Sequence, residues 1–555
     1  MYPRWPALIP VMLVLAGCNT AQSARDRAAD AIREDVYRKH VEALASDEFE
    51  GRAPGSAGEK KTIEYLEQQF VELGLRPAAG DSFRQPVPLV EITAMPSASF
   101  LNFEGGGRRV ELALGEEMVV GTRRTQPAVA VTASDVVFVG YGIVAPEYGW
   151  NDYAGLDMRG KTALILVNDP GFATGDPGLF NGRSMTYYGR WTYKFEEAAR
   201  QGAAAAIIVH QTEPAAYPWA VVRNGWTGPQ FYADAADGNA GRSAIEGWIT
   251  LERAREIVAM GGDDFEALER AAKQRGFEPV PLGLKASAGV RNLIRRARSP
   301  NIAAVMPGRG RPDEYVIYMA HWDHLGKALA VSGDTVFNGA EDNATGVAAI
   351  LTIARAFRKM VPPPERSILF LAVTAEESGL IGSAYYAEHP LVPLERTAAV
   401  INIDRLSPLG RARDIQVIGF GASELEDRLA AAAERQDRVL TPDGKPEAGY
   451  FYRSDHFNLA KKGVPALYVK AGADLIDQPP GTGQAILDEY VKNRYHKQAD
   501  DYSPDWDVSG SLEDMQLLFE VGAQVASDGS WPAWYEGNEF RAAREASAAA
   551  REPAP

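Results

Sequence analysis

The chain of 555 residues has a single cysteine, Cys18, which limits the chemistry open to it. One cysteine cannot form an intrachain disulfide, and it cannot supply the several thiolates of a cysteine-based metal cluster. Positive charge is also scarce, because 58 lysine and arginine residues stand against 74 acidic ones and the net charge is −16. This balance argues against nucleic acid or an anionic membrane surface as a partner. It does not exclude a local cleft of the opposite sign.

The lone cysteine lies at the end of an N-terminal apolar segment. Arg4 precedes an apolar run over residues 5–16, and Gly17 and Cys18 follow it. This pattern predicts a signal peptide, and its ending resembles a bacterial lipobox. The resemblance implies cleavage before Cys18, lipidation of its thiol and a periplasmic, lipid-anchored protein. Asn19 in place of aspartate favours the outer membrane. The alternative is an ordinary secretory signal with a chance cysteine. No later apolar run is long enough to span a bilayer, so membrane contact is expected through the N-terminal lipid only.

The length of the chain and the changes in its pattern of apolar residues indicate more than one domain. A chain of 555 residues is too long for one compact core. Residues 29–75 show helical spacing of apolar residues, the part beginning near residue 117 shows short strands and turns, and residues 301–522 alternate strand and helix. We therefore expect a signal peptide at 1–17, a tether at 18–27, a main domain at 28–117 and 286–540, a β-rich insert at 118–285 and a disordered tail at 541–555.

The main domain is predicted to have an α/β fold. Near-continuous apolar runs over residues 315–320, 367–374, 398–404 and 464–469 are typical of buried strands, and residues 344–357 form an amphipathic helix. Strands of this kind alternating with helices favour a mostly parallel mixed sheet flanked by helices on both faces.

Acidic residues and one histidine lie at the carboxyl ends of three of these strands. His321 directly follows the first strand, Glu376 and Glu377 follow the second, and Asp404 closes the third. In open α/β sheets, ligands bind in the crevice at this edge of the sheet. The three strand ends therefore predict one common site.

Two further candidates come from loops. Asp342 precedes the helix at 344–357, and His496 lies in a late loop. Two divalent cations ~3.5–4 Å apart repel each other, so a shared carboxylate is needed between them. Imidazole and carboxylate ligands suit zinc best, although cobalt or manganese could substitute. A separate carboxylate must then take a proton from water and pass it to the leaving amine.

The ordered motifs resemble the co-catalytic di-zinc aminopeptidase family of metallopeptidase clan MH. That family also includes glutamate carboxypeptidase II, the glutaminyl cyclases and the inactive transferrin receptor. The resemblance covers residues 28–540, and the part at 118–285 resembles an inserted protease-associated domain. The motifs are HWDHLG at 321–326, GAEDNATG at 339–346, TAEESG at 374–379, NID at 402–404, SDH at 454–456 and YH at 495–496.

The resemblance implies a ligand set for two Zn²⁺ ions. One metal would bind His321, Asp342 and Asp404, and the other Asp342, Glu377 and His496, so that Asp342 bridges the pair.

The resemblance also assigns supporting roles. Glu376 would be the general base, and Asp323 would orient His321. We interpret His324 as a supporting residue and not a ligand. Arg405 stands where the family usually has an apolar residue, and it could either form an ion pair behind the ligands or line the substrate cleft.

Four residues near residue 450 are candidates for the substrate cleft. Tyr450, Tyr452 and Arg453 could donate to a developing oxyanion or hold a substrate terminus, and His456 is interpreted as a residue of the cleft wall. The alternative for this segment is ordinary loop packing.

The sequence thus predicts a zinc-dependent exopeptidase acting on peptides, most simply an aminopeptidase that releases N-terminal residues. A carboxypeptidase for acidic peptides would need a basic pocket, for which Arg453 and Arg405 are the nearby candidates. Acyl transfer of the glutaminyl cyclase kind and a non-catalytic binding lipoprotein are further alternatives. The sequence does not indicate an oligomeric state.

Overall fold

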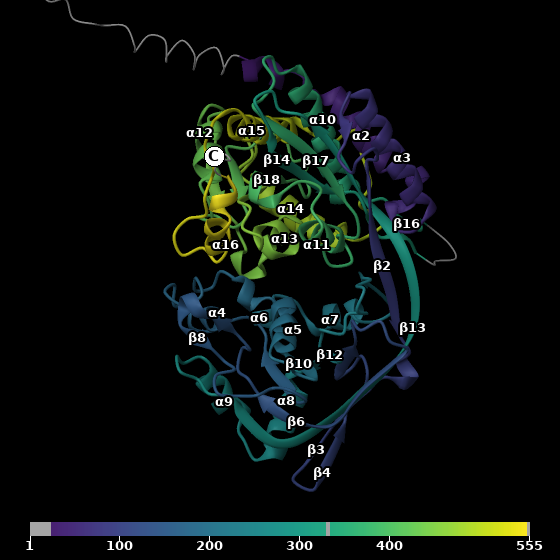
Figure 1. The fold of residues 1–555 in the computed structure, drawn as a ribbon, viewed down its shortest axis with the longest axis vertical. Coiled ribbons are helices and arrows are strands. Elements are labelled where there is room, and N and C mark those ends of the chain that lie inside the picture. The colour runs from purple at the N-terminus through teal and green to yellow at the C-terminus, as the bar shows by residue number, and fades with distance from the viewer. Residues whose placement is uncertain (1–23, 329–333, 552–555) are drawn as a thin grey trace, which may run out of the picture. The chain divides into compact units, whose positions relative to one another are not determined.

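The computed structural model describes residues 24–328 and 334–551 (Figure 1). The predicted signal peptide and Cys18 lie outside the described residues. The chain divides into two compact units, the first within Met1–Pro86, Ser299–Asp443 and Ser454–Pro555, and the second at Val87–Arg298 and Gly444–Arg453. The second unit is longer at both ends than the predicted insert at 118–285, because its boundaries lie within two long strands, β2 (Arg84–Ala94) and β13 (Val280–Met306).

The first unit contains a mixed sheet with a parallel centre. The strands predicted at 315–320, 367–374, 398–404 and 464–469 are all present, and β17 and β18 are buried along their whole length, as the apolar runs require. Strands β17, β14, β18 and β21 are parallel to one another, whereas β13 and β19 join the sheet antiparallel. The order is β1 (Arg76–Pro77), β13, β17 (Arg366–Val373), β14 (Arg311–His321), β18 (Thr397–Asn402), β21 (Ala466–Ala471), β19 (Asp414–Val417) and β20 (Val439–Pro442).

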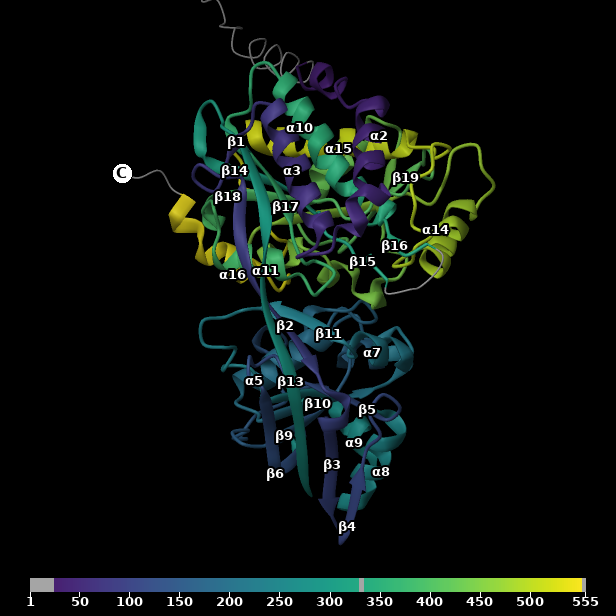
Figure 2. The same cartoon turned by 90° about the vertical axis from the view of Figure 1, so that its right-hand side faces the viewer.

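Helices cover both faces of this sheet, which confirms the predicted fold class (Figures 1 and 2). Helix α10 (Thr345–Lys359) and helix α15 (Ser509–Ser527) pack against β14, and α2 (Glu34–Leu44) packs on α10. Helix α10 is buried around almost its whole circumference, because α2 covers its outer side. Further helices of this unit are α3 (Ala57–Glu72), α11 (Ile381–Glu388), α12 (Leu425–Glu434), α13 (His456–Ala460) and α14 (Thr482–Asn493).

The second unit has a sheet and hydrophobic cores of its own. Its strands β6, β9, β10 and β12 are parallel to one another, and antiparallel strands flank them. The order is β4 (Arg108–Glu111), β3 (Phe100–Gly105), β13, β6 (Ala128–Phe138), β9 (Thr162–Leu166), β10 (Ala205–His210), β12 (Ile245–Thr250) and β5 (Met118–Gly121). The main helices are α5 (Trp191–Arg200), α7 (Trp219–Gly225), α8 (Leu251–Gly261) and α9 (Phe265–Ala272).

The C-terminal segment differs from the disordered tail expected at 541–555. Helix α16 (Arg541–Ala546) and a 3₁₀ helix at Ala548–Arg551 continue to the last described residue. Arg544 is only 3% exposed, and its guanidinium donates to the carbonyl oxygens of Thr397, Ala398 and Pro532. Two of these partners, Thr397 and Ala398, are 147 and 146 positions away in the sequence, so the local composition of the tail does not reveal the contacts.

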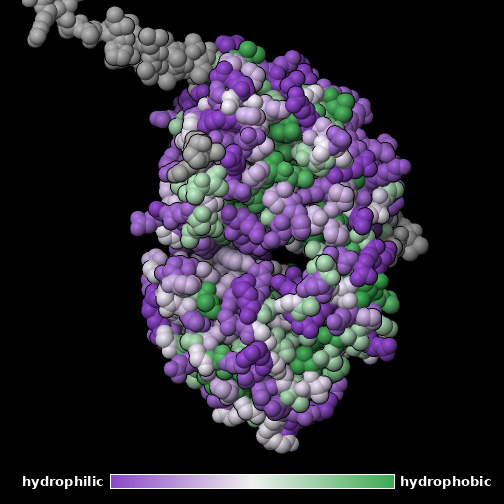
Figure 3. Space-filling model, viewed as in Figure 1, coloured by the Kyte–Doolittle hydropathy of each residue, from purple (hydrophilic) through white to green (hydrophobic). Residues whose placement is uncertain are grey.

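The visible surface carries mostly hydrophilic side chains, with apolar ones in small groups (Figure 3). Within the described residues, no helix combines the length and apolar character needed to cross a bilayer.

Candidate metal centre

The structure brings the five predicted ligands together at the carboxyl edge of the first unit's sheet. His321 is the last residue of β14, and Asp404 lies two residues beyond β18. Glu377 lies in the turn after β17. Asp342 lies in the segment Ala340–Ala344 that leads into α10, and His496 follows α14. Segments far apart along the chain thus converge on one position.

Asp342 lies between two histidines. The imidazole Nε2 of His321 is 3.3 Å from Oδ1 of Asp342 and 3.6 Å from Oδ1 of Asp404. The Nε2 of His496 is 3.3 Å from the other oxygen of Asp342, Oδ2, and 3.0 Å from Oε2 of Glu377. Each oxygen of Asp342 therefore belongs to a different group of three residues, which is the arrangement a bridging carboxylate needs. Ligand atoms of His321, Asp342 and Glu377 all lie within 4.8 Å of one another.

The carboxylates of the candidate site are buried close together, and positive charge is needed to balance them. Burial of a histidine favours its neutral form and lowers its pKa. At His321 and His496 the neighbouring carboxylates have the larger effect. They raise the pKa of His321 well above its usual value and the pKa of His496 to about 10. Burial alone would raise the pKa of Asp342, but its contacts with the two histidines hold that pKa well below the usual range. Without cations, protonated histidines balance the carboxylates. Divalent cations would do the same, and the nitrogen and oxygen donors suit zinc. The residues present therefore fit a metal pair.

The turn that carries Glu376 and Glu377 is held by Asp323. Its carboxylate accepts the backbone N–H of Glu376 at 3.0 Å and that of Glu377 at 3.4 Å. The same carboxylate is 3.9 Å from Nδ1 of His321. That Nδ1 atom is hydrogen-bonded instead to the backbone carbonyl oxygen of Asp323, at 3.1 Å. Nδ1 of His324 lies 2.6 Å from Oε1 of Glu377. Asp323 and His324 thus fix the positions of metal-site residues, and the carboxylate of Asp323 does so chiefly through the turn.

Asp500 is a site residue that sequence reasoning missed. Its buried carboxylate accepts the backbone N–H of Glu341 and of Asp342, both at 3.0 Å, and the hydroxyl of Tyr490 at 3.1 Å. These bonds fix the backbone of the segment that presents Asp342, whose peptide bond to Asn343 is cis. The only signal in the sequence is the position of Asp500 four residues after His496.

The structure distinguishes between the two alternatives for Arg405. Its Nε lies 3.5 Å from Oε1 of Glu341, and its guanidinium carbon lies 4.6 Å from the centroid of the Tyr490 ring. The hydroxyl of Ser407 also donates to Glu341. Burial raises the pKa of Glu341 to about 7 although Arg405 opposes this rise. Arg405 therefore forms an ion pair next to the segment of Asp342.

The four cleft candidates belong to two different units. His456 is fully buried, with its ring centroid 5.1 Å from that of Tyr468, so it lies in the interior and not on an open cleft wall. Tyr450, Tyr452 and Arg453 belong to the second unit, where the rings of Tyr452 and Tyr187 stack at 6.3 Å. Their role in substrate binding stays a prediction.

Part of the chain is similar in sequence to known peptidases. Mouse aminopeptidase NAALADL1 is 36% identical over 137 residues, which are 23% of this chain and 17% of that protein. A glutamate carboxypeptidase 2 homolog of Caenorhabditis elegans is 32% identical over 127 residues, 22% of this chain and 15% of that protein. The chain thus spans less than a fifth of the length of these relatives.

Among solved structures, an aminopeptidase from Aneurinibacillus sp. strain AM-1 is similar over 91% of this chain and 97% of its own, with a TM-score of 0.51 and 22% sequence identity. This likeness shows the fold. Residues 301–519, which include every candidate ligand and Glu376, match the model of peptidase family M28. The segment that carries the candidate ligands is therefore similar to peptidase family M28.

Proposed function

We propose that the chain is a two-zinc exopeptidase, most simply an aminopeptidase that releases N-terminal residues from peptides. The observation that carries the proposal is the position of Asp342, whose two oxygens face His321 and His496 separately at 3.3 Å each. The match to peptidase family M28 and the aminopeptidases among the similar proteins support the reaction class.

The chain's own residues would hold the metals. His321, Asp342 and Asp404 would bind one zinc ion, and Asp342, Glu377 and His496 the other. Bound zinc supplies Lewis acidity and lowers the pKa of water.

Glu376 would carry the proton. Its backbone N–H donates to Asp323, and its side chain interacts electrostatically with His321 and Glu377. Burial, together with Glu377 and Asp404, raises the pKa of Glu376 well above its usual value, although His321 opposes this shift. A carboxylate of raised pKa is a stronger base than an ordinary one, which suits a group that accepts a proton from water and donates it to the leaving amine.

An acidic-peptide carboxypeptidase is the second candidate, favoured by the similarity to the glutamate carboxypeptidase 2 homolog. It would need cationic side chains for the substrate's terminal carboxylate. One of the two nearby candidates, Arg405, is already paired with Glu341. This pairing favours the aminopeptidase.

The setting of the enzyme is part of the proposal. The lipobox-like sequence at Cys18 supports a lipid anchor, and with Asn19 after it the enzyme would lie in the periplasm, at the outer membrane. The second unit would serve as a protease-associated domain. Incorporation of labelled fatty acid into the wild-type chain, and its loss in Cys18→Ser, is the expected result for the anchor. Equal labelling of both chains would contradict it.

Paired dipeptide assays test the reaction. We expect hydrolysis of carboxyl-blocked dipeptides and of aminoacyl nitroanilides, its loss on treatment with a chelator and its recovery with zinc. Hydrolysis of amino-blocked dipeptides instead would indicate a carboxypeptidase, and release of pyroglutamyl peptide would indicate a cyclase. Complete inactivity of the zinc-loaded protein would favour a binding protein.

A further inference from the structure

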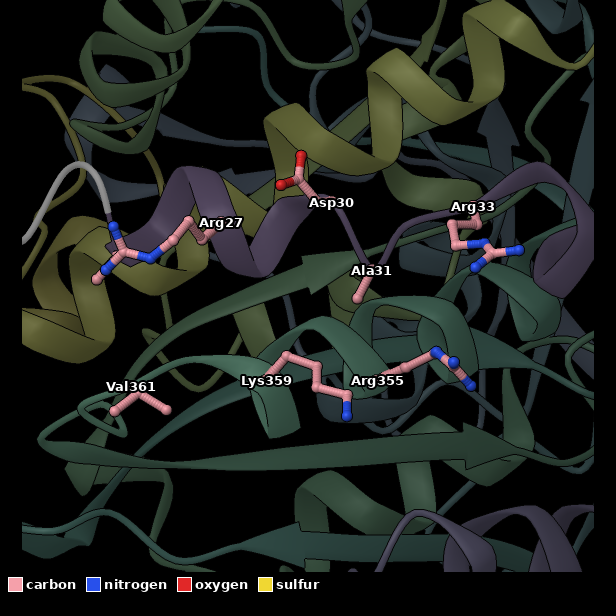
Figure 4. Close-up of a pocket in the computed structure, with 8 residues that line it drawn as sticks. Arg27, Asp30, Ala31, Arg33, Arg355, Lys359 and Val361 are labelled. Carbon is pink, nitrogen blue, oxygen red and sulfur yellow. The ribbon is translucent and has the colours of Figure 1, made fainter.

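A basic hollow lies beside the N-terminal segment of the first unit, and none of its lining residues is a candidate metal ligand (Figure 4). Its volume is about 450 Å³. Arg27 and Arg33 come from the N-terminal segment, and Arg355 and Lys359 come from α10. The complete lining is Ala24, Arg27, Asp30, Ala31, Arg33, Arg355, Lys359 and Val361.

The hollow concentrates positive charge on a chain whose net charge is −16. Four cationic side chains line it against one acidic one, Asp30, whose carboxylate points away from Arg355 and Lys359 in Figure 4. Arg33 shares its charge with Asp35, which lies 2.8 Å away at an exposed position. The Nε atom of Arg355 is buried without a hydrogen-bond partner. Arg27 and Arg33 each have contacts of their own, so Arg355 and Lys359 carry the remaining excess of positive charge, which would attract an anionic group.

An exposed apolar side chain lies at the edge of the same hollow. Val361 is 73% exposed, more than any other large hydrophobic side chain that the structure describes. Basic side chains beside an exposed apolar one suit the interface of an anionic membrane, where phosphate groups lie next to the acyl region. A soluble anion would use the charges alone and would leave Val361 without a partner.

The position in the sequence points to the same occupant. Ala24 and Arg27 of the hollow come six and nine residues after Cys18. Six residues span at most about 20 Å. A lipid on Cys18 would thus hold the hollow close to the membrane surface and give it a high local concentration of headgroups.

We propose that the hollow formed by Arg27, Arg33, Arg355 and Lys359 binds the headgroups of anionic phospholipids and, with Val361, seats the first unit on the membrane. The proposal rests on the lipid anchor proposed above and is independent of the peptidase reaction. It explains how a strongly acidic protein can approach an anionic membrane surface through one face.

The test measures binding of the unlipidated chain from residue 19 onward to vesicles, so that the result does not depend on the anchor. We expect sedimentation with vesicles that contain phosphatidylglycerol, little with pure phosphatidylcholine, and weaker binding at high salt. Arg355→Glu combined with Lys359→Glu should lower the partition coefficient on the order of 10–100-fold, because each basic residue near the surface contributes about fivefold or more. Val361→Asp should lower it as well.

The matched control is Lys60→Glu combined with Arg108→Glu, which changes the net charge equally at side chains that are 79% and 61% exposed. The control should bind as the wild type does. Equal loss in both double variants would show a general charge effect and overturn the proposal. Binding of inorganic phosphate in calorimetry, lost in the Arg355 and Lys359 double variant while vesicle binding is unchanged, would show a small-anion site and would also overturn it.

Discussion

Replacement of Asp500 by asparagine should weaken metal binding without removing any ligand. The two carboxylate oxygens of Asp500 accept the N–H groups of Glu341 and Asp342 separately. Asparagine has a single side-chain oxygen, so its NH₂ group must face one of these N–H groups. The substitution therefore removes one hydrogen bond and places two donors against each other beside Asp342.

The magnitude follows from the cost of an unsatisfied donor. A buried N–H group without a partner costs about 1–3 kcal/mol. Tyr490, which donates to the same carboxylate, also loses part of its contact. If this cost falls on the conformation that binds metal, zinc affinity should fall on the order of 10–100-fold, as it commonly does when a residue supporting a metal ligand is replaced.

Competition with a chelator of known affinity measures this effect on the purified chain. Asp501→Asn is the matched control, because Asp501 accepts from Asn338 and has no hydrogen bond to the segment of Asp342. We expect the control to bind zinc as the wild type does and Asp500→Asn to bind it more weakly, with kcat restored at saturating zinc. Equal zinc affinity in the two variants would refute the assigned role of Asp500.

Two further predictions concern proton transfer and pH. Glu376→Gln should retain both zinc ions, measured by mass spectrometry, and lose on the order of 10²–10⁴ in kcat; turnover near the wild-type rate would remove Glu376 from its role. Burial lowers the pKa of His40 to about 4 in the folded chain. The unfolded chain, with a pKa near 6.5, therefore binds the proton first, and stability present above that pH is lost as the pH falls. Between pH 7 and 5.5, the free energy of unfolding measured in urea should fall by about 1 kcal/mol less in His40→Gln than in the wild type. Equal decreases in the two proteins would contradict this.

Local pattern was sufficient to predict the centre of the sheet. Runs such as 367–374 and 398–404 are apolar at nearly every position, because both faces of these strands are buried, and they correspond to β17 and β18. A strand that joins the two units, β13, was harder to predict. Strand β13 contains several arginine and serine residues, and its partners lie far away in the sequence, so no local apolar run marks its full extent.

The convergence of the candidate ligands was predictable for a related reason. Four of the candidates lie at the ends of helices or strands, or within a few residues of such an end: His321, Asp342, Glu377 and Asp404. The topology of the sheet alone brings such ends together at one edge. Asp500 and the buried state of His456 were not predictable, because each depends on packing between segments. The contact from Asp342 to Asp500, for example, joins residues 158 positions apart.

The central claim is that Asp342 holds two metal ions together. Crystals of the zinc-loaded chain, with anomalous scattering collected at the zinc absorption edge, test it directly. We predict two zinc peaks, one between His321 and Asp404 and one between Glu377 and His496, with Asp342 touching both, and loss of the pair in Asp342→Ala. A single peak in the wild type, or an unchanged pair in the variant, would contradict the account.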